Sequence, residues 1–270
     1  RSSDLESTIM HEVQKAPPID PQQQDASCRS SGQTDEERAY YSLNERVYRW
    51  FAPLYDMVTN PIARLRREVA ELAGVGAGMR VLDVATGTGA QAFAFVARGA
   101  EVVGIDLSEA MLRIARRKNL DSRVTFLHAD ATALPFTDAG FDVACISFAL
   151  HEMPRTVRTA AVLELARVTR PGGTVVVVDY ALPESSMRRL LVYHAVKLYE
   201  PDPYTDFVRS DLRVLLADAG IQAPEGRSRV FGAVKIWTAI NGARAGRHAE
   251  FSTGIPRPAT TTRSLVRADD

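Results

Sequence analysis

The sequence has little cysteine, no long apolar run and no excess of charge of either sign. Its two cysteines, Cys28 and Cys145, show neither a disulfide framework nor the spacing of metal ligands, so no metal centre is predicted. Because disulfides are rare in reducing compartments, this cysteine usage favours a cytoplasmic protein. Cys145 lies in the apolar run FDVACISFAL, and we expect its thiol to be buried.

These absences also limit the classes of partner. No apolar run approaches the roughly 20 residues that cross a bilayer, and the first residues lack the apolar centre of a signal peptide. The 33 basic and 33 acidic residues cancel, so the chain has no broad positive field for nucleic acid. We therefore expect no transmembrane segment and no nucleic-acid partner, while the oligomeric state stays open.

The two ends of the chain differ from its middle in composition. Residues 1–38 are polar and rich in Pro, Gln and Ser, and residues 243–270 have a similar character. Such segments bury too little surface to offset the entropy of ordering, so we expect both to be disordered. Residues 39–242 are predicted to form one domain, because 46% hydrophobic residues in 270 are ample for a sizeable core.

Within this domain, β-rich apolar runs alternate with helix-like segments. Strands are expected in MRVLDVA, AEVVGIDL, RVTFLHA, FDVACISFAL and GTVVVVDY, with helices between most of them. This alternation predicts right-handed βαβ units and a doubly wound α/β fold, with a mostly parallel sheet and helices on both faces. Ser108 and Thr156 are expected to cap two of the helices.

A glycine-rich loop follows the first predicted strand, in VLDVATGTGAQA. Gly87 and Gly89 allow a tight turn and a close approach of the backbone to a ligand. The N-terminus of the next helix favours an anionic group. The G-x-G-x-x-A pattern is weak alone, because a plain strand-to-helix turn or a dinucleotide site would also produce it.

Two acidic residues identify the ligand more closely. Asp106, at the end of the second strand, can accept hydrogen bonds from both hydroxyls of a ribose. Asp83, inside the end of the first strand, would repel the pyrophosphate of a dinucleotide. S-adenosylmethionine has a ribose, an adenine and an ammonium group but no phosphate, so this cofactor fits both acids. In HADATALPF, Asp130 and Ala131 are placed to meet an adenine edge, with Leu134 packing against the ring.

The ordered set VLDVATGTG, VVGIDLS, HADATALPF, ISFALHEM and RVTRPGGTVVVVD resembles the Rossmann-like S-adenosylmethionine-dependent methyltransferases. Within that family it is most similar to the group of the ubiquinone/menaquinone C-methyltransferases, over residues 45–241. The resemblance implies a seven-stranded sheet with six parallel strands and a C-terminal β-hairpin, which GRSRVFGAVKIWTAI fits with a turn near Phe231. It also implies N-terminal helices that act as a partial lid.

The same resemblance implies which residues contact the cofactor. The expected cofactor-binding residues are Asp83, Gly87, Thr88, Gly89, Asp106, Leu107, Asp130, Ala131 and Ser147. Asp83 is expected to reach the methionine ammonium directly or through water. The implied activity is transfer of a methyl group to a small-molecule or lipid-like acceptor.

Methyl transfer from a sulfonium is an in-line displacement, and an acceptor O–H or acidic C–H must also lose its proton. His151 follows the fourth strand in ISFALHEM and is the candidate base, although it could equally bind the backbone of a loop. Glu152 reads as a loop or helix-start residue. Asp179 and Tyr180, which end the fifth strand, lie near the same expected pocket.

Two segments are interpreted as parts of a lid. One is YHAVKLYEPDPYTDF, residues 193–207, and the other contains Tyr55 and Asp56, which match a Tyr-Asp pair in the family. The residues after Asp56, and Asp179-Tyr180, depart from the pattern of the quinone enzymes. A phospholipid amine, a small natural product or another nucleophile therefore remains an alternative to a quinol acceptor.

Two other functional classes are weighed against methyl transfer. A nicotinamide-dependent oxidoreductase is disfavoured by Asp83, by the terminal hairpin and by the absence of a Tyr-x-x-x-Lys pair. A methyltransferase-like regulatory or scaffold protein, which binds the cofactor without turnover, is the second alternative. The intact glycine loop and Asp106 speak against lost binding but do not test turnover.

Overall fold

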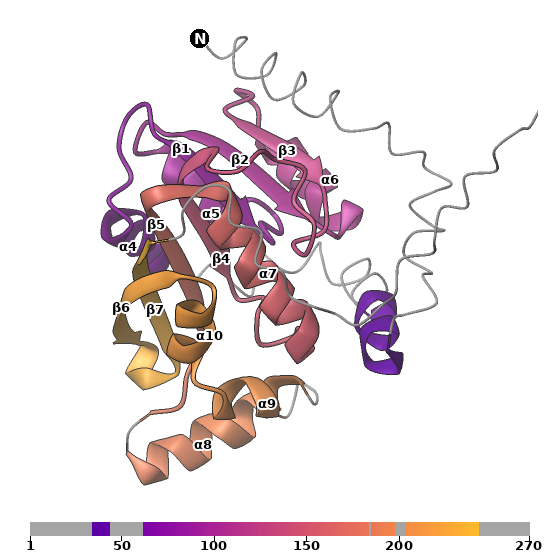
Figure 1. Ribbon diagram of the computed structural model, residues 1–270, viewed down its shortest axis with the longest axis vertical. Helices are drawn as coiled ribbons and strands as arrows, with labels where there is room; N and C mark the ends of the chain where they lie inside the picture. The colour runs from indigo at the N-terminus through magenta and orange to yellow at the C-terminus, as the bar shows by residue number, and fades with distance from the viewer. Residues whose placement is uncertain (1–33, 44–61, 184, 198–202, 243–270) are drawn as a thin grey trace, which may run out of the picture.

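The computed structural model describes residues 34–43, 62–183, 185–197 and 203–242 of the chain (Figure 1). Residues 35–43 form a helix, so residues 35–38 of the predicted N-terminal tail are helical. The rest of that tail, the C-terminal tail and the Tyr55-Asp56 segment lie outside the described residues. No helix in the described ranges is both long and apolar enough to cross a membrane.

One seven-stranded sheet forms the centre of the domain, in the order β3-β2-β1-β4-β5-β7-β6. Its strands are β1 (Arg80–Val84), β2 (Glu101–Asp106), β3 (Val124–His128), β4 (Phe141–Ser147), β5 (Thr169–Tyr180), β6 (Ile221–Arg229) and β7 (Val234–Asn241). The pairs from β3 through β5 are parallel, and β7 is antiparallel to both β5 and β6. Six strands therefore share one direction, as the family resemblance implied.

Helices cover both faces of this sheet. The labelled helices of the domain are α4 (Ala63–Leu72), α5 (Ala90–Val96), α6 (Glu109–Lys118), α7 (Arg155–Val168), α8 (Ser186–Lys197), α9 (Pro203–Arg209) and α10 (Leu212–Asp218). Side chains from α4, α5 and α6 pack into one buried cluster, and side chains from α7 and α10 pack into the other. The doubly wound α/β arrangement is confirmed.

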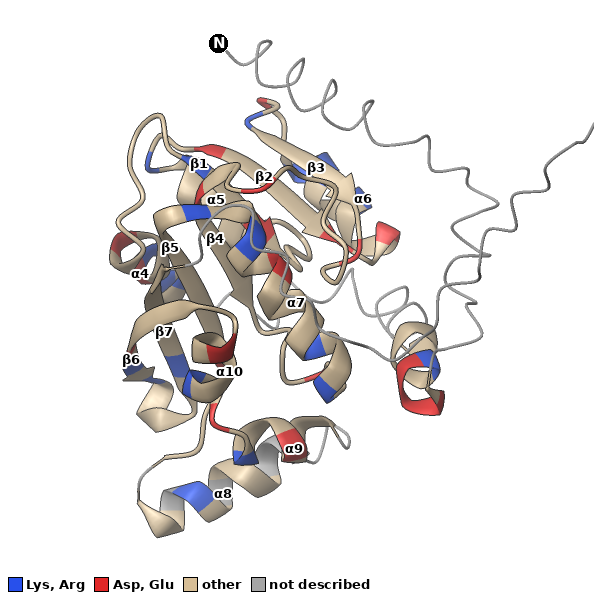
Figure 2. Ribbon diagram, viewed as in Figure 1, with Lys and Arg blue, Asp and Glu red and all other residues tan. Residues whose placement is uncertain are grey.

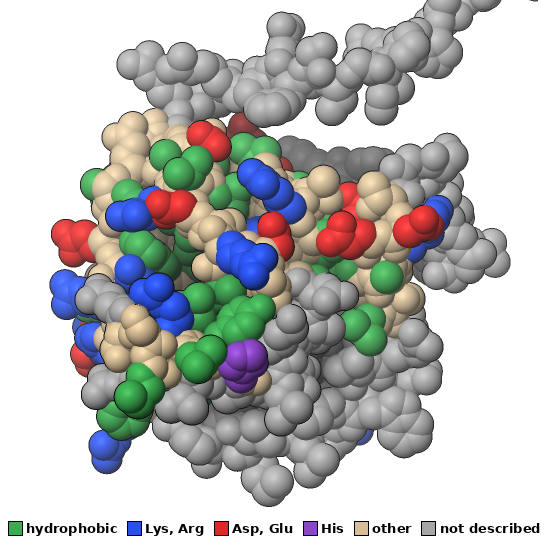
Figure 3. All heavy atoms as spheres, turned by 90° about the horizontal axis from the view of Figure 1, so that it is seen from below, with side chains coloured by type: hydrophobic (Ala, Val, Ile, Leu, Met, Phe, Trp, Pro, Cys, Tyr) green, Lys and Arg blue, Asp and Glu red, His purple; other side chains and the backbone are tan. Residues whose placement is uncertain are grey.

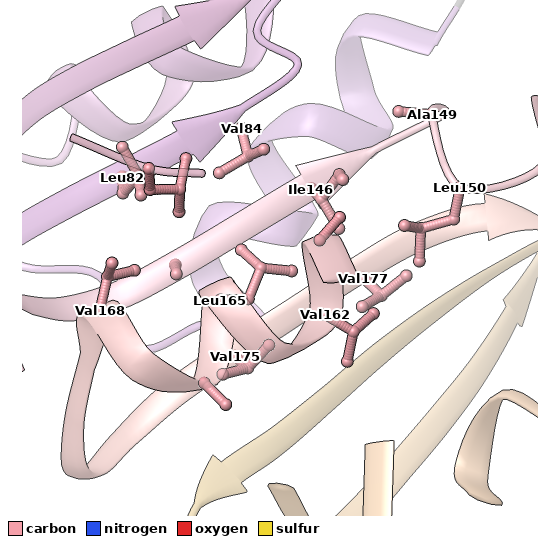
Figure 4. Close-up of a cluster of buried hydrophobic side chains, with 14 of the residues drawn as sticks. Leu82, Val84, Ile146, Ala149, Leu150, Val162, Leu165, Val168, Val175 and Val177 are labelled. Carbon is pink, nitrogen blue, oxygen red and sulfur yellow. The ribbon is translucent and has the colours of Figure 1, made fainter. Parts of the chain in front are cut away.

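The period-two pattern of the strands produces these two clusters. In β5, Val175 and Val177 belong to the cluster under α7, whereas Val176 and Val178 belong to the opposite one. Figure 4 shows Val175 and Val177 facing Val162 and Leu165 of α7. Strands buried on both faces require such continuous apolar runs, and VVVV supplies one at the centre of the sheet.

Local signals explain where several elements begin and turn. The Ser108 side chain accepts a hydrogen bond from the Met111 N–H and caps α6, as predicted. The prediction for Thr156 was wrong, because α7 begins one residue earlier with Pro154 as its N-cap, and the Thr156 hydroxyl donates instead to Glu37. The hairpin turns at Val230–Gly232, close to the predicted position.

The order of the strands reverses between β1 and β4. In open parallel sheets, ligands bind at the carboxyl ends of the strands beside such a switch point. The loops after β1, β2, β3 and β4 meet there, and α8 and α9 extend beyond the sheet at the lower end of Figure 1. The fold thus brings the predicted site residues to one edge.

Candidate cofactor and acceptor site

The loop after β1 has a backbone that most residues avoid. Ala85, Gly87 and Gly89 all have positive φ, at 54°, 55° and 80°. Gly89 precedes α5 as its N-cap, and a Cβ atom there would lie 2.7 Å from the Phe126 ring. Gly89 is therefore required by both its φ and its packing, which keeps the loop tight over the end of the sheet.

Asp106 holds this loop to the neighbouring strand. Its carboxylate accepts hydrogen bonds from the backbone N–H of Gly87 and of Ser108, each at 2.7 Å. Burial raises the pKa of Asp106, and the hydrogen bonds from Ser108 and Gly87 counteract part of this effect. The carboxylate borders the cavity described next.

A cavity with an empty volume of about 660 Å³ opens where the loops meet. Six of the nine expected cofactor-binding residues line it, namely Gly87, Asp106, Leu107, Asp130, Ala131 and Ser147. Thr88, Gly89 and Asp83 do not line it. Figure 2 shows acidic positions gathered between the ends of the central strands and α7. The cavity wall contains three carboxylates, from Asp106, Asp130 and Glu152.

Asp83 lies beneath the glycine loop and is 1% exposed. Its carboxylate accepts a hydrogen bond of 2.5 Å from the hydroxyl of Thr86. Burial raises the pKa of Asp83 to about 7, and the hydrogen bond from Thr86 opposes this shift. Asp83 is therefore placed to act through the loop rather than at the cavity surface.

Asp130 and Ala131 form the wall that follows β3. The Asp130 Oδ1 atom accepts hydrogen bonds from the backbone N–H and the hydroxyl of Thr132, both at 2.8 Å. These bonds hold the carboxylate at the cavity. Ala131 also lines the cavity and packs against the buried cluster that contains Leu134. The wall thus combines an acceptor with a small apolar surface.

His151 lies behind the cavity, not on its wall. The residue is 2% exposed, and its Nδ1 atom lies 2.7 Å from Oδ1 of the buried Asp179. The imidazole also packs against Tyr180, with ring centroids 4.6 Å apart. The next residue, Glu152, lines the cavity. The acid that the sequence analysis assigned to a loop therefore reaches the cavity, whereas the predicted base does not.

Two residues of the site escaped the sequence analysis. Tyr40, from the helix spanning 35–43, lines the cavity, and burial followed by the negative charge of Glu152 raises its pKa well above 10. Arg158 of α7 is 2% exposed and donates to the backbone oxygens of Leu150 and Met153, each at 3.0 Å. The sequence did contain a signal for Arg158, because it is a charged residue among the apolar positions of α7 that face the core.

A second, wider groove lies between the end of β5, helices α9 and α10, and the hairpin. Its lining is aromatic and basic, with Tyr180, Phe207, Trp237, Arg209, Arg213 and Lys235 among the residues. Figure 3 shows hydrophobic and basic side chains interspersed on the face seen from below. Tyr204 and Phe207 of the predicted lid segment are buried, so part of that segment forms packing rather than an open surface.

Comparison with known proteins assigns this geometry to a family. A model described as a methyltransferase domain matches residues 81–173. The chain is 36% identical to a demethylmenaquinone methyltransferase from Clavibacter sepedonicus over a 210-position alignment, which covers 68% of this chain and 80% of that one. The chain belongs to the S-adenosyl-L-methionine-dependent methyltransferases. This membership sets aside the nicotinamide oxidoreductase alternative.

Two further similarities cover different shares of the chains compared. A demethylmenaquinone methyltransferase from Renibacterium salmoninarum is 39% identical over 137 residues, and the match spans only 49% of this chain and 56% of that relative. The structure of phosphoethanolamine N-methyltransferase 2 from Haemonchus contortus, in complex with S-adenosyl-L-methionine, has a TM-score of 0.59 at 16% identity. It covers 76% of this chain and 60% of that one, and shows the shared fold.

Proposed function

We propose that this methyltransferase moves the methyl group of S-adenosylmethionine to a carbon of a hydroxyaromatic, quinol-type acceptor. The observation that carries the proposal is the cavity in which Gly87 and Asp106 face Asp130 and Glu152. Three carboxylates disfavour a phosphate-bearing ligand and favour a cationic one such as a sulfonium with an ammonium group. Relatives named demethylmenaquinone methyltransferases support the acceptor class.

In this proposal each cavity residue has a chemical role. Asp106 accepts from the ribose hydroxyls, and Asp130 accepts from the exocyclic amine of adenine. Leu107 and Ala131 pack against the ring, while Gly87 and Ser147 border the methionine end. Thr88 and Gly89 shape the loop, and the charge of Asp83 acts on the ammonium through that loop.

The protein contributes mainly placement to the reaction. S-adenosylmethionine supplies an activated methyl group, and the site must hold the acceptor carbon in line with the sulfur–methyl bond. A phenol carbon becomes a stronger nucleophile when the ring hydroxyl loses its proton, so the site also needs a base. The predicted candidate is His151, which follows β4 and lies beside Asp179 at the end of β5.

Calorimetry and a turnover assay test the proposal. S-adenosylmethionine and S-adenosylhomocysteine are expected to bind in the micromolar range, and NAD is not, because three carboxylates would face its pyrophosphate. Release of S-adenosylhomocysteine is then measured with demethylmenaquinol and with phosphatidylethanolamine. Turnover of the quinol supports the proposal, and turnover of the amine alone would refute the acceptor class. Binding without any turnover would favour the scaffold alternative.

A further inference from the structure

Glu152 is the ionisable side chain of the β4–α7 loop that reaches the cavity. It lines the cavity with Met153, and its side chain is 26% exposed. Its Oε1 atom lies 3.8 Å from Nε2 of His151, whose side chain is 3% exposed. A solute in the cavity can therefore contact Glu152 directly. His151 lies behind Glu152 and is nearly inaccessible to the solute.

His151 is held in one orientation from behind. The Asp179 carboxylate lies 2.7 Å from Nδ1 and also accepts from the backbone N–H of Tyr180, at 2.8 Å. Since an ionised carboxylate only accepts hydrogen bonds, Nδ1 carries the hydrogen, and Nε2 is the nitrogen that faces Glu152. The three side chains form a chain from the buried interior to the cavity.

We propose that Glu152 is the catalytic base and that His151 and Asp179 are its positioning residues. The inference rests on the proposed methyl transfer. The acceptor hydroxyl gives its proton to the Glu152 carboxylate, and the O–H electron pair stays on the acceptor. The ring carbon then bonds to the methyl group, and the electrons of the broken carbon–sulfur bond neutralise the sulfonium as a thioether. The displaced ring proton leaves to solvent as the aromatic ring is restored, and protonated Glu152 returns a proton to the acceptor oxygen, which regenerates its carboxylate.

His151 and Asp179 complete this proton path. Nε2 of His151 lies 3.8 Å from Oε1 of Glu152, beyond hydrogen-bond distance, so a small closing movement would let protonated Glu152 pass its proton to His151 and form an imidazolium between two carboxylates. Asp179 is 2% exposed, so its charge stabilises that imidazolium in a site with little water. An equivalent arrangement, in which a buried carboxylate orients an imidazole, serves many bases.

Several other charged or titratable groups surround Glu152. Asp106 and Asp130 share the cavity wall, and Tyr40 faces Glu152 from the helix spanning 35–43. Behind the loop, Arg158 pairs with Asp206 of α9 at 3.1 Å. Burial keeps Tyr40 in its phenol form, so Tyr40 can donate to the acceptor oxygen but does not compete as the base.

Kinetics with demethylmenaquinol test the base. Glu152→Gln is expected to lower kcat by about 100-fold or more and to remove the rising limb of the pH profile, both measured at saturating S-adenosylmethionine. Glu152→Asp should restore part of kcat. His151→Asn should lower kcat by about tenfold and displace the limb. Glu71→Gln, on the surface of α4, is the matched control. A Glu152→Gln enzyme that keeps both its rate and its limb would overturn the proposal.

An acceptor-independent measurement separates this proposal from the proposed function. In protein with ¹⁵N-labelled histidine and bound S-adenosylhomocysteine, Glu152→Gln should shift the Nε2 signal of His151, while Glu71→Gln should leave it in place. If demethylmenaquinol is not turned over, that shift still supports the Glu152–His151 pair. An unmoved signal would show that the two side chains do not interact and would sink the proposal.

Discussion

The proposed cofactor side of the sheet and the proposed acceptor side have cavity walls that are built in different ways. In the first half, β1 to β4, the backbone of the loops makes the wall, and Asp106 ties one loop to the next strand. In the second, β5 to β7 with α8 to α10, long side chains line a wide groove. Met187 and Phe231 of this half are 75% and 86% exposed.

The match to the methyltransferase domain model covers mainly the first of these halves. The methyltransferase domain match ends at residue 173, before the apolar core of β5. A fixed ligand such as S-adenosylmethionine demands fixed backbone geometry, which constrains glycine and aspartate positions. A variable acceptor demands only side chains of suitable shape and charge. Substitutions on the cofactor side are therefore expected to change the affinity for S-adenosylmethionine. Substitutions on the acceptor side are expected to change which acceptor is methylated.

The largest effect is expected where the two halves are joined. Arg158 donates to the carbonyls of Leu150 and Met153 and to Asp206 of α9. Arg158→Met leaves the buried carbonyls without these donors, so the free energy of unfolding in urea should fall by about 3 kcal/mol. The matched control is Arg213→Met on α10, whose ion pair with Asp211 is exposed and is expected to contribute little to stability. Equal losses in the two variants would mean that Arg158 does not join the halves.

More of the predicted site residues line a cavity on the proposed cofactor side than on the proposed acceptor side, for a physical reason. Gly87, Asp106 and Asp130 lie at or shortly after the ends of strands, and the carboxyl ends of parallel strands meet at one edge. Tyr40 and Arg158 instead belong to segments that meet others far away in the chain. The helix spanning 35–43 joins α7 through Glu37 and Thr156, and Arg158 donates to Asp206 of α9. The adjacent residues His151 and Glu152 face opposite sides of one loop, and periodicity does not reveal which side a loop residue takes.

A smaller effect should test the cofactor side directly. Asp106→Ala is expected to weaken S-adenosylmethionine binding by about 10- to 100-fold, because hydrogen bonds to a charged group are worth about 1.5–3 kcal/mol. The loss also frees the Gly87 N–H and loosens the loop. Asp121→Ala, at an exposed position before β3, serves as the control in calorimetry. An Asp106→Ala affinity within twofold of wild type would place the ribose elsewhere.

The smallest effect concerns Asp83 and the pH dependence of stability. Burial raises the pKa of Asp83 from 3.8 in the unfolded chain to about 7 in the folded protein. The folded state therefore binds this proton more tightly, and the contribution to stability is fully present below pH 3.8 and lost as the pH rises through 7.

Between pH 5 and 7, the free energy of unfolding of the wild type should fall by about 1 kcal/mol per pH unit relative to Asp83→Asn, which keeps an acceptor for the Thr86 hydroxyl. Urea unfolding at several pH values measures this difference, with Asp218→Asn on the exposed side of α10 as the control. A wild type that instead gains stability over Asp83→Asn as the pH rises would show that Asp83 is ionised and paired beneath the loop.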